Sequence, residues 1–172
     1  FNESAHEPGT KTLLGARYSA GESGGIQALN DLAIHPSTAQ FIAYKLAKHF
    51  VSDIPPKALV KRLAKSFQQS NGDLMELAKT LIDAPETWSH RREKLKTPYE
   101  WMMGVSRCSG WTVAEKTFGA LRSLRQAPFT APSPQGWSDD AADWMGPEAV
   151  LARLDIAERF GQRMARRGAV NS

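Results

Sequence analysis

The spacing of apolar residues between Pro56 and Gln69 is the feature that most constrains the fold. These apolar residues follow one another at steps of one, three, one and three positions, and they are Leu59, Val60, Leu63, Ala64 and Phe67. Such spacing places them along one side of an α-helix, with mostly basic residues on the other side. A helix with one apolar side needs a neighbour to cover it, so the segment predicts packed helices.

The same spacing recurs along most of the chain. It is present from Pro36 to Val51 and from Asp73 to Ala84, where Pro85 ends the pattern. Strand-like alternation is weak and limited to residues 10–19. We therefore expect α-helices over residues 24–34, 37–51, 56–69, 73–84, 98–108, 113–126 and 147–167.

Helix-start signals support these ranges. An acceptor side chain is followed by an acid three residues later in the pairs Asp73 and Glu76, Thr97 and Glu100, and Thr112 and Glu115. Pro98 and Pro147 suit the first position of a helix, where the missing N–H costs nothing.

The expected fold class is all-α, a single-core array of about seven helices in hairpins. Residues 1–23 form an irregular N-terminal segment in this prediction, and residues 128–146 form a Pro-rich loop with two tryptophans. We expect one helical domain over residues 1–172. Because the chain opens on Phe1 and not on Met, we also expect it to be a fragment of a larger protein.

Composition excludes several classes of protein. A single cysteine, Cys108, rules out an intrachain disulfide or a multi-cysteine zinc site. No run approaches the roughly 20 apolar residues that a membrane span needs. The excess of 22 basic over 18 acidic residues is mild, so specific nucleic-acid binding is not predicted. The histidine spacing predicts no metal site, and no cofactor motif is present.

Six residues are candidates for a functional cleft. His6, Glu7 and Lys11 place an imidazole, an acid and an amine in one loop, where they suit general acid/base chemistry or simply pin the loop. His35 precedes a helix and caps it, or else points into a cleft. Trp137 and Asp139 suit the rim of a groove for a glycan, although core filling is the ordinary role of tryptophan.

Short sequence motifs spread over most of the chain match those of a known protein family. They include His6-Glu7-Pro8-Gly9, His35-Pro36-Ser37-Thr38-Ala39, Gly72-Asp73-Leu74 and Pro132-Ser133-Pro134-Gln135-Gly136-Trp137. In these motifs the chain resembles the bacterial DUF1800 family of unknown function. The resemblance implies that this chain is the C-terminal fragment of a longer parent protein. It also implies a gene beside one of the DUF1501 family, and export to the periplasm or beyond. No catalytic residue is established for that family, so none is implied here.

Two functions from different classes follow from these residues. The first is a non-enzymatic interaction or scaffold domain of a larger bacterial envelope-associated protein, with the DUF1501-type product as a possible partner. The second is a hydrolase that acts on a glycan or peptide through a His/carboxylate cleft. Convergence of His6, Glu7, His35 and Asp139 in one open pocket would favour the enzyme, and their dispersal or use in capping would favour the scaffold.

Overall fold

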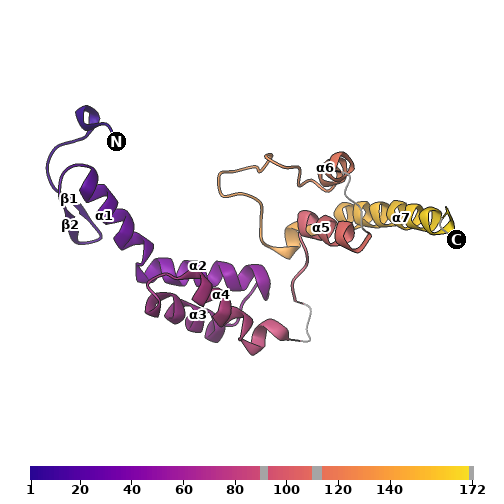
Figure 1. The fold of residues 1–172 in the computed structure, drawn as a ribbon, viewed down its shortest axis with the longest axis horizontal. Helices are drawn as coiled ribbons and strands as arrows, with labels where there is room; N and C mark the ends of the chain where they lie inside the picture. Colours follow the sequence, from indigo (N-terminus) through magenta and orange to yellow (C-terminus); the bar gives the residue numbers. More distant parts are fainter. Residues whose placement is uncertain (90–92, 110–113, 171–172) are drawn as a thin grey trace. The chain divides into compact units, whose positions relative to one another are not determined.

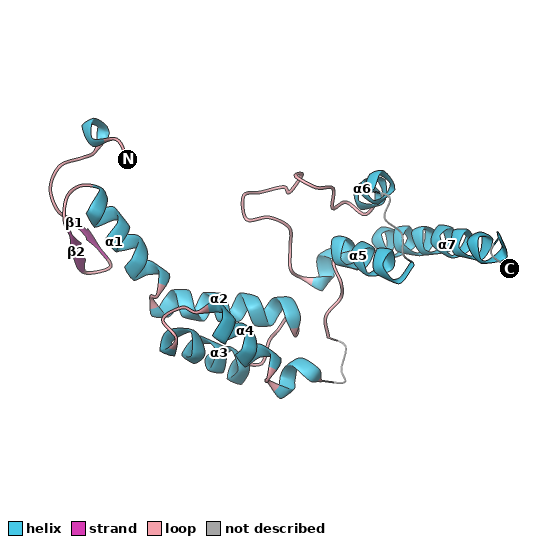
Figure 2. Ribbon diagram, in the orientation of Figure 1, coloured by secondary structure: helices cyan, strands magenta, loops and turns pink. Residues whose placement is uncertain are grey.

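The computed structural model describes residues 1–89, 93–109 and 114–170. The chain divides into two compact units, Phe1–Arg91 and Arg92–Ser172, which we call unit 1 and unit 2 and describe separately (Figure 1). The described residues form seven α-helices and one two-stranded hairpin (Figure 2). The predicted all-α class is therefore confirmed.

Unit 1 begins with a 3₁₀ turn, a hairpin and a first helix. The turn is η1 (Glu3–Ala5), the strands are β1 (Lys11–Leu13) and β2 (Ala16–Tyr18), and the helix is α1 (Glu22–Ala33). The strands pair antiparallel, and the Leu14 and Gly15 between them both have positive φ, as a type I′ turn requires. Residues 10–19, which carry only a weak strand signal, contain both strands, so the segment 1–23 is not irregular throughout as predicted. Helix α1 begins two residues before its predicted start.

Three further helices of unit 1 form its core. They are α2 (Pro36–Phe50), α3 (Lys57–Gln69) and α4 (Leu74–Ile82), followed by the 3₁₀ turn η2 (Pro85–Trp88). Helices α2 and α3 lie side by side (Figure 1), and the Ala39, Ala43 and Ala47 that α2 buries there are small enough for close approach. The apolar residues that predicted α3 are all buried in this cluster, together with Leu77, Leu81 and Ala84.

Unit 2 contains α5 (Pro98–Ser109), α6 (Ala114–Ser123), the 3₁₀ turn η3 (Ala141–Trp144) and α7 (Pro147–Val170). Its buried cluster consists of Met102, Leu121, Leu124, Ile156 and Phe160. We expected one shared core, whereas most of the buried apolar residues that the structure describes form two clusters, one in each unit. The single domain over residues 1–172 stays a prediction.

Helix α6 ends three residues before its predicted end. Arg125 adopts a φ of 61°, which α-helical backbone does not allow, and this turns the chain after Leu124. The turn frees Gln126 from the helix, and its side-chain carbonyl accepts the Tyr99 N–H at 2.7 Å. Gln126 thereby satisfies an amide at the start of α5.

Tryptophans anchor the long loop before α7. Trp144 is buried, its Nε1 donates to the Ser138 carbonyl at 2.9 Å, and its ring lies 6.1 Å from that of the partly buried Trp137. The two rings give this Pro-rich segment apolar contacts of its own, as loops of this length need.

Two of the predicted capping pairs are described. Thr97 and Glu100 form a full capping box, in which each backbone N–H is bound by the other side chain at 2.8 and 3.4 Å. Asp73 accepts the N–H groups of Met75 and Glu76 at 2.7 and 3.3 Å, while the Glu76 carboxylate pairs with Lys79. Thr112 lies outside the described residues.

Removing the Asp73 cap should weaken α4. We expect Asp73→Ala to lower the free energy of unfolding of unit 1 by about 0.5–2 kcal/mol, because two helix N–H groups lose their acceptor. Asp73→Asn keeps an acceptor oxygen and should restore most of that loss. Urea unfolding followed by circular dichroism measures both variants. Equal destabilisation by the two substitutions would show that the cap is not the cause.

Candidate functional site

A pocket of about 620 Å³ opens between the β1–β2 hairpin and α1 in unit 1. Its walls are mainly apolar, and the large side chains that line it are those of Phe1, Leu13, Tyr18, Ile26 and Leu29. His6, Lys11 and Glu22 add polar groups to the lining. We call this the N-terminal pocket. Its volume falls within the roughly 300–1,000 Å³ of small-molecule sites.

The hairpin and α1 are held together by two close contacts. The Tyr18 hydroxyl donates to Asp31 on α1 at 3.0 Å, and the Tyr18 side chain is buried. At Gly24 a Cβ atom would collide with the backbone carbonyl of Ser19, so only glycine permits the helix to approach this closely. These contacts fix one wall of the N-terminal pocket against the other.

His6 fastens the N-terminal segment to the start of α1. Its Nε2 accepts the backbone N–H of Gly21 at 3.2 Å, and its ring centroid lies 5.1 Å from that of Phe1. Since Nε2 accepts a hydrogen bond, it carries no proton in this arrangement. The lone pair that a general base would use is thus already engaged.

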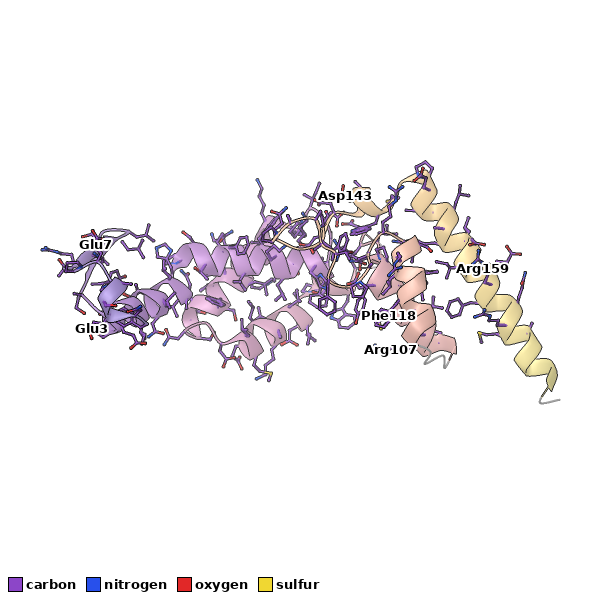
Figure 3. All side chains as sticks on the ribbon, turned by 90° about the horizontal axis from the view of Figure 1, so that it is seen from above. Glu3, Glu7, Arg107, Phe118, Asp143 and Arg159 are labelled. Atoms are coloured by element: carbon purple, nitrogen blue, oxygen red, sulfur yellow. The ribbon has the colours of Figure 1, made fainter. Side chains whose placement is uncertain are left out.

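Glu7 and Lys11 form an exposed ion pair beside the pocket. Lys11 Nζ lies 2.9 Å from the Glu7 carboxylate and also donates to the Pro8 carbonyl at 3.2 Å. The hydrogen bond from Lys11, and then its charge, lower the pKa of Glu7 from its ordinary value. Glu7 projects at the N-terminal end of unit 1 (Figure 3), where water screens the pair.

The other three candidate residues lie elsewhere. His35 precedes α2, and its Nδ1 accepts the Ser37 N–H at 3.1 Å, which is the capping role expected for it. Trp137 and Asp139 belong to unit 2, where Trp137 packs on Trp144 and the Asp139 carbonyl accepts from Lys94. Among the six candidates, the structure brings together His6, Glu7 and Lys11.

Two large apolar lining residues are not among those that the sequence patterns single out. Ile26 and Leu29 lie in the helix predicted over residues 24–34, and they stay 53% and 68% exposed on α1. Periodicity identifies an apolar side of a helix and does not say whether anything covers it. The Gly24–Gly25 pair at the start of the helix was the available signal for a close backbone approach.

Two classes of site find no support in the parts of the chain that the structure describes. No group of three or more His, Cys, Asp or Glu residues is arranged to hold a metal ion there. Likewise, none of the described helices combines the length and apolarity that crossing a bilayer requires.

A comparison with models of known protein families shows to which family the chain belongs. The model of the family described as "Protein of unknown function (DUF1800)" matches residues 1–171. The chain belongs to the DUF1800 family. The resemblance seen in the sequence motifs is thereby confirmed. No curated protein and no solved structure matches this DUF1800 chain.

The Tyr18–Asp31 contact makes the stability of unit 1 depend on pH. Burial, and then the hydrogen bond and negative charge of Asp31, raise the pKa of Tyr18 above its ordinary value. A raised pKa in the folded state means that the stabilisation is full below about pH 10 and is lost as the pH rises through the folded-state value. Urea unfolding should show a larger stability gap between the wild type and Tyr18→Phe at about pH 8 than at about pH 11. A gap that does not change with pH would contradict this assignment.

Proposed function

We propose that this DUF1800 chain is an interaction domain of a bacterial envelope-associated protein and binds a partner through the N-terminal pocket. The observation that carries the proposal is the uncovered apolar side of α1. Ile26 and Leu29 line the pocket and remain more than half exposed. Exposed apolar residues gathered at one concave site are typical of a binding surface.

The energetics favour an apolar ligand group at this site. Burying one Ile or Leu side chain completely contributes about 1.5–3 kcal/mol. Ile26, Leu29 and Leu13 together therefore offer a useful part of the free energy that protein association requires. We propose that the ligand group is an apolar segment of a partner protein, and the first candidate partner is the product of the adjacent DUF1501-type gene.

The polar groups at the pocket support binding over catalysis. His6 uses Nε2 to hold Gly21, and Glu7 and Lys11 neutralise each other. An acid/base catalyst needs a group whose proton or lone pair is directed at the substrate. These three residues instead stabilise the loop that forms the pocket rim.

Affinity measurements with the purified DUF1501-type protein test the proposal. We expect Leu29→Asp to weaken binding at least a hundredfold, because a charge would have to be buried against the partner. Leu74→Asp is the matched control, since Leu74 is 64% exposed on α4, outside the pocket. It should change the affinity less than threefold. Equal effects of the two substitutions, or no effect of either, would refute the pocket as the binding site.

The alternative function is a hydrolase that acts on a glycan or a peptide. The observation in its favour is that His6 and Lys11 line the pocket and that Glu7 pairs with Lys11 beside it. A hydrolase would release reducing sugar or free amine from cell-wall glycan or peptide, and His6→Gln would abolish that release. If the wild type shows such turnover and His6→Gln loses it while remaining folded, the enzymatic function replaces the interaction domain.

A further inference from the structure

The α2–α3 hairpin, residues 36–69, carries a one-sided distribution of charge. It contains six basic residues and one acidic residue, Asp53, and neither helix contains an acid. The following segment, residues 70–88, has the opposite balance, with four acidic residues and one lysine. By this balance of charge alone we call the hairpin the basic side of unit 1 and residues 70–88 its acidic side, and Arg62 on the first pairs with Glu86 on the second.

Three lysines on α3 remain available for an anionic partner. Lys57, Lys61 and Lys65 follow one another at intervals of four residues, so they form a row along one side of the helix. All three are exposed, and no ion pair or hydrogen bond engages their amines within the described residues. Arg62, by contrast, is paired with Glu86 at 2.6 Å.

Apolar side chains project from the turn that precedes this row. Ile54 is 89% exposed and lies in the short stretch between α2 and α3, and Phe50, the last residue of α2 before that stretch, is more than half exposed. The His49 ring packs edge-on against Phe50 at 4.6 Å. An exposed turn with two large apolar side chains thus leads directly into a row of lysines.

We propose that the α2–α3 turn and the lysine row of α3 bind the surface of an anionic lipid bilayer. Ile54 and Phe50 enter the boundary between headgroups and acyl chains, and Lys57, Lys61 and Lys65 contact lipid phosphates. The net positive charge of the hairpin complements an anionic surface.

Two other anionic partners fit these residues less well. A nucleic acid would be contacted through hydrogen bonds and stacking, and an aliphatic side chain such as Ile54 supplies neither. A protein interface is usually poor in lysine and rich in arginine at its centre. A lysine row beside apolar side chains is instead typical of peripheral membrane contacts.

Vesicle co-sedimentation of the full chain tests the proposal. We expect binding to phosphatidylcholine vesicles that contain one quarter phosphatidylglycerol, at least tenfold weaker binding to phosphatidylcholine alone, and loss of most binding at about 0.5 M salt. Equal binding to both kinds of vesicle, or no binding to either, would overturn the proposal. Tighter binding to a nucleic acid than to the anionic vesicles would overturn it in favour of a nucleic-acid surface.

Matched variants locate the contact on unit 1. Ile54→Ser should weaken vesicle binding about tenfold, because the apolar insertion is lost, whereas Leu74→Ser removes a similarly exposed side chain from α4 and should leave binding within twofold. Lys61→Glu should weaken it about 25-fold and Lys79→Glu on the acidic side less than threefold. All four positions are exposed, so the variants should fold, which circular dichroism verifies. Equal losses within either pair would overturn the proposal.

Discussion

Leu63→Ala should destabilise unit 1 by about 2–5 kcal/mol. Leu63 is fully buried on α3, in the centre of the cluster that α2, α3 and α4 share. The substitution removes apolar contacts and leaves a cavity that close-packed neighbours on three helices can fill only in part. A loss of this size is a large fraction of the free energy of unfolding of a small domain.

Chemical denaturation of the full chain measures this loss. Leu74→Ala is the control, because it makes the same chemical change at an exposed position of α4 and should cost less than about 0.5 kcal/mol. If Leu63→Ala proved as mild as Leu74→Ala, the buried cluster described for unit 1 would be incorrect. Both substitutions replace leucine with alanine in a helix, so they change helix propensity alike. The difference between their effects on stability therefore reports the burial of Leu63.

The second large effect is expected at Gly24. Gly24→Ala places a Cβ against the backbone carbonyl of Ser19, and backbone cannot move aside as a flexible side chain can. We expect a cost of about 1–3 kcal/mol at the junction of the hairpin and α1. The N-terminal pocket lies at this junction, so ligand binding there should weaken as well.

Gly25→Ala provides the matched control for Gly24→Ala. Open space surrounds the Cβ position of Gly25, and alanine is preferred to glycine within a helix, so this variant should gain about 0.5–1 kcal/mol. Hydrogen exchange of the α1 amides measures both changes locally. Faster exchange in Gly24→Ala and slower exchange in Gly25→Ala are expected. The same direction of change in both variants would contradict the close contact with Ser19.

The helices of unit 1 were predictable because their apolar sides are buried as the spacing implies. Leu59, Leu63 and Phe67 predicted α3, and all three are in the core. The hairpin was only weakly indicated, since its two strands have three residues each and its pairing depends on the positive φ of Leu14 and Gly15. Strands of this length are too short for an alternation of apolar and polar residues to be recognised in the sequence.

The candidate site was predictable only in part. His6, Glu7 and Lys11 are close in sequence, so their proximity followed from the loop that contains them. His35 and Asp139 do not join these three residues. Whether distant residues meet depends on long-range packing, which the chemistry of the side chains alone does not reveal. Ile26 and Leu29 present the opposite difficulty. Their spacing on the helix is typical of core residues, but here they line a pocket.

Hydrogen exchange with and without the purified DUF1501-type protein tests whether this chain is an interaction domain that works through the N-terminal pocket. If the purified DUF1501-type protein binds as proposed, its addition should slow exchange at least tenfold for amides of the β1–β2 hairpin and of α1 (Glu22–Ala33), while those of α4 should keep their rates. If exchange slowed at α4 but not at α1, the N-terminal pocket would not be the binding site. If no amide changed its rate at a saturating concentration of the DUF1501-type protein, the proposed interaction would be contradicted.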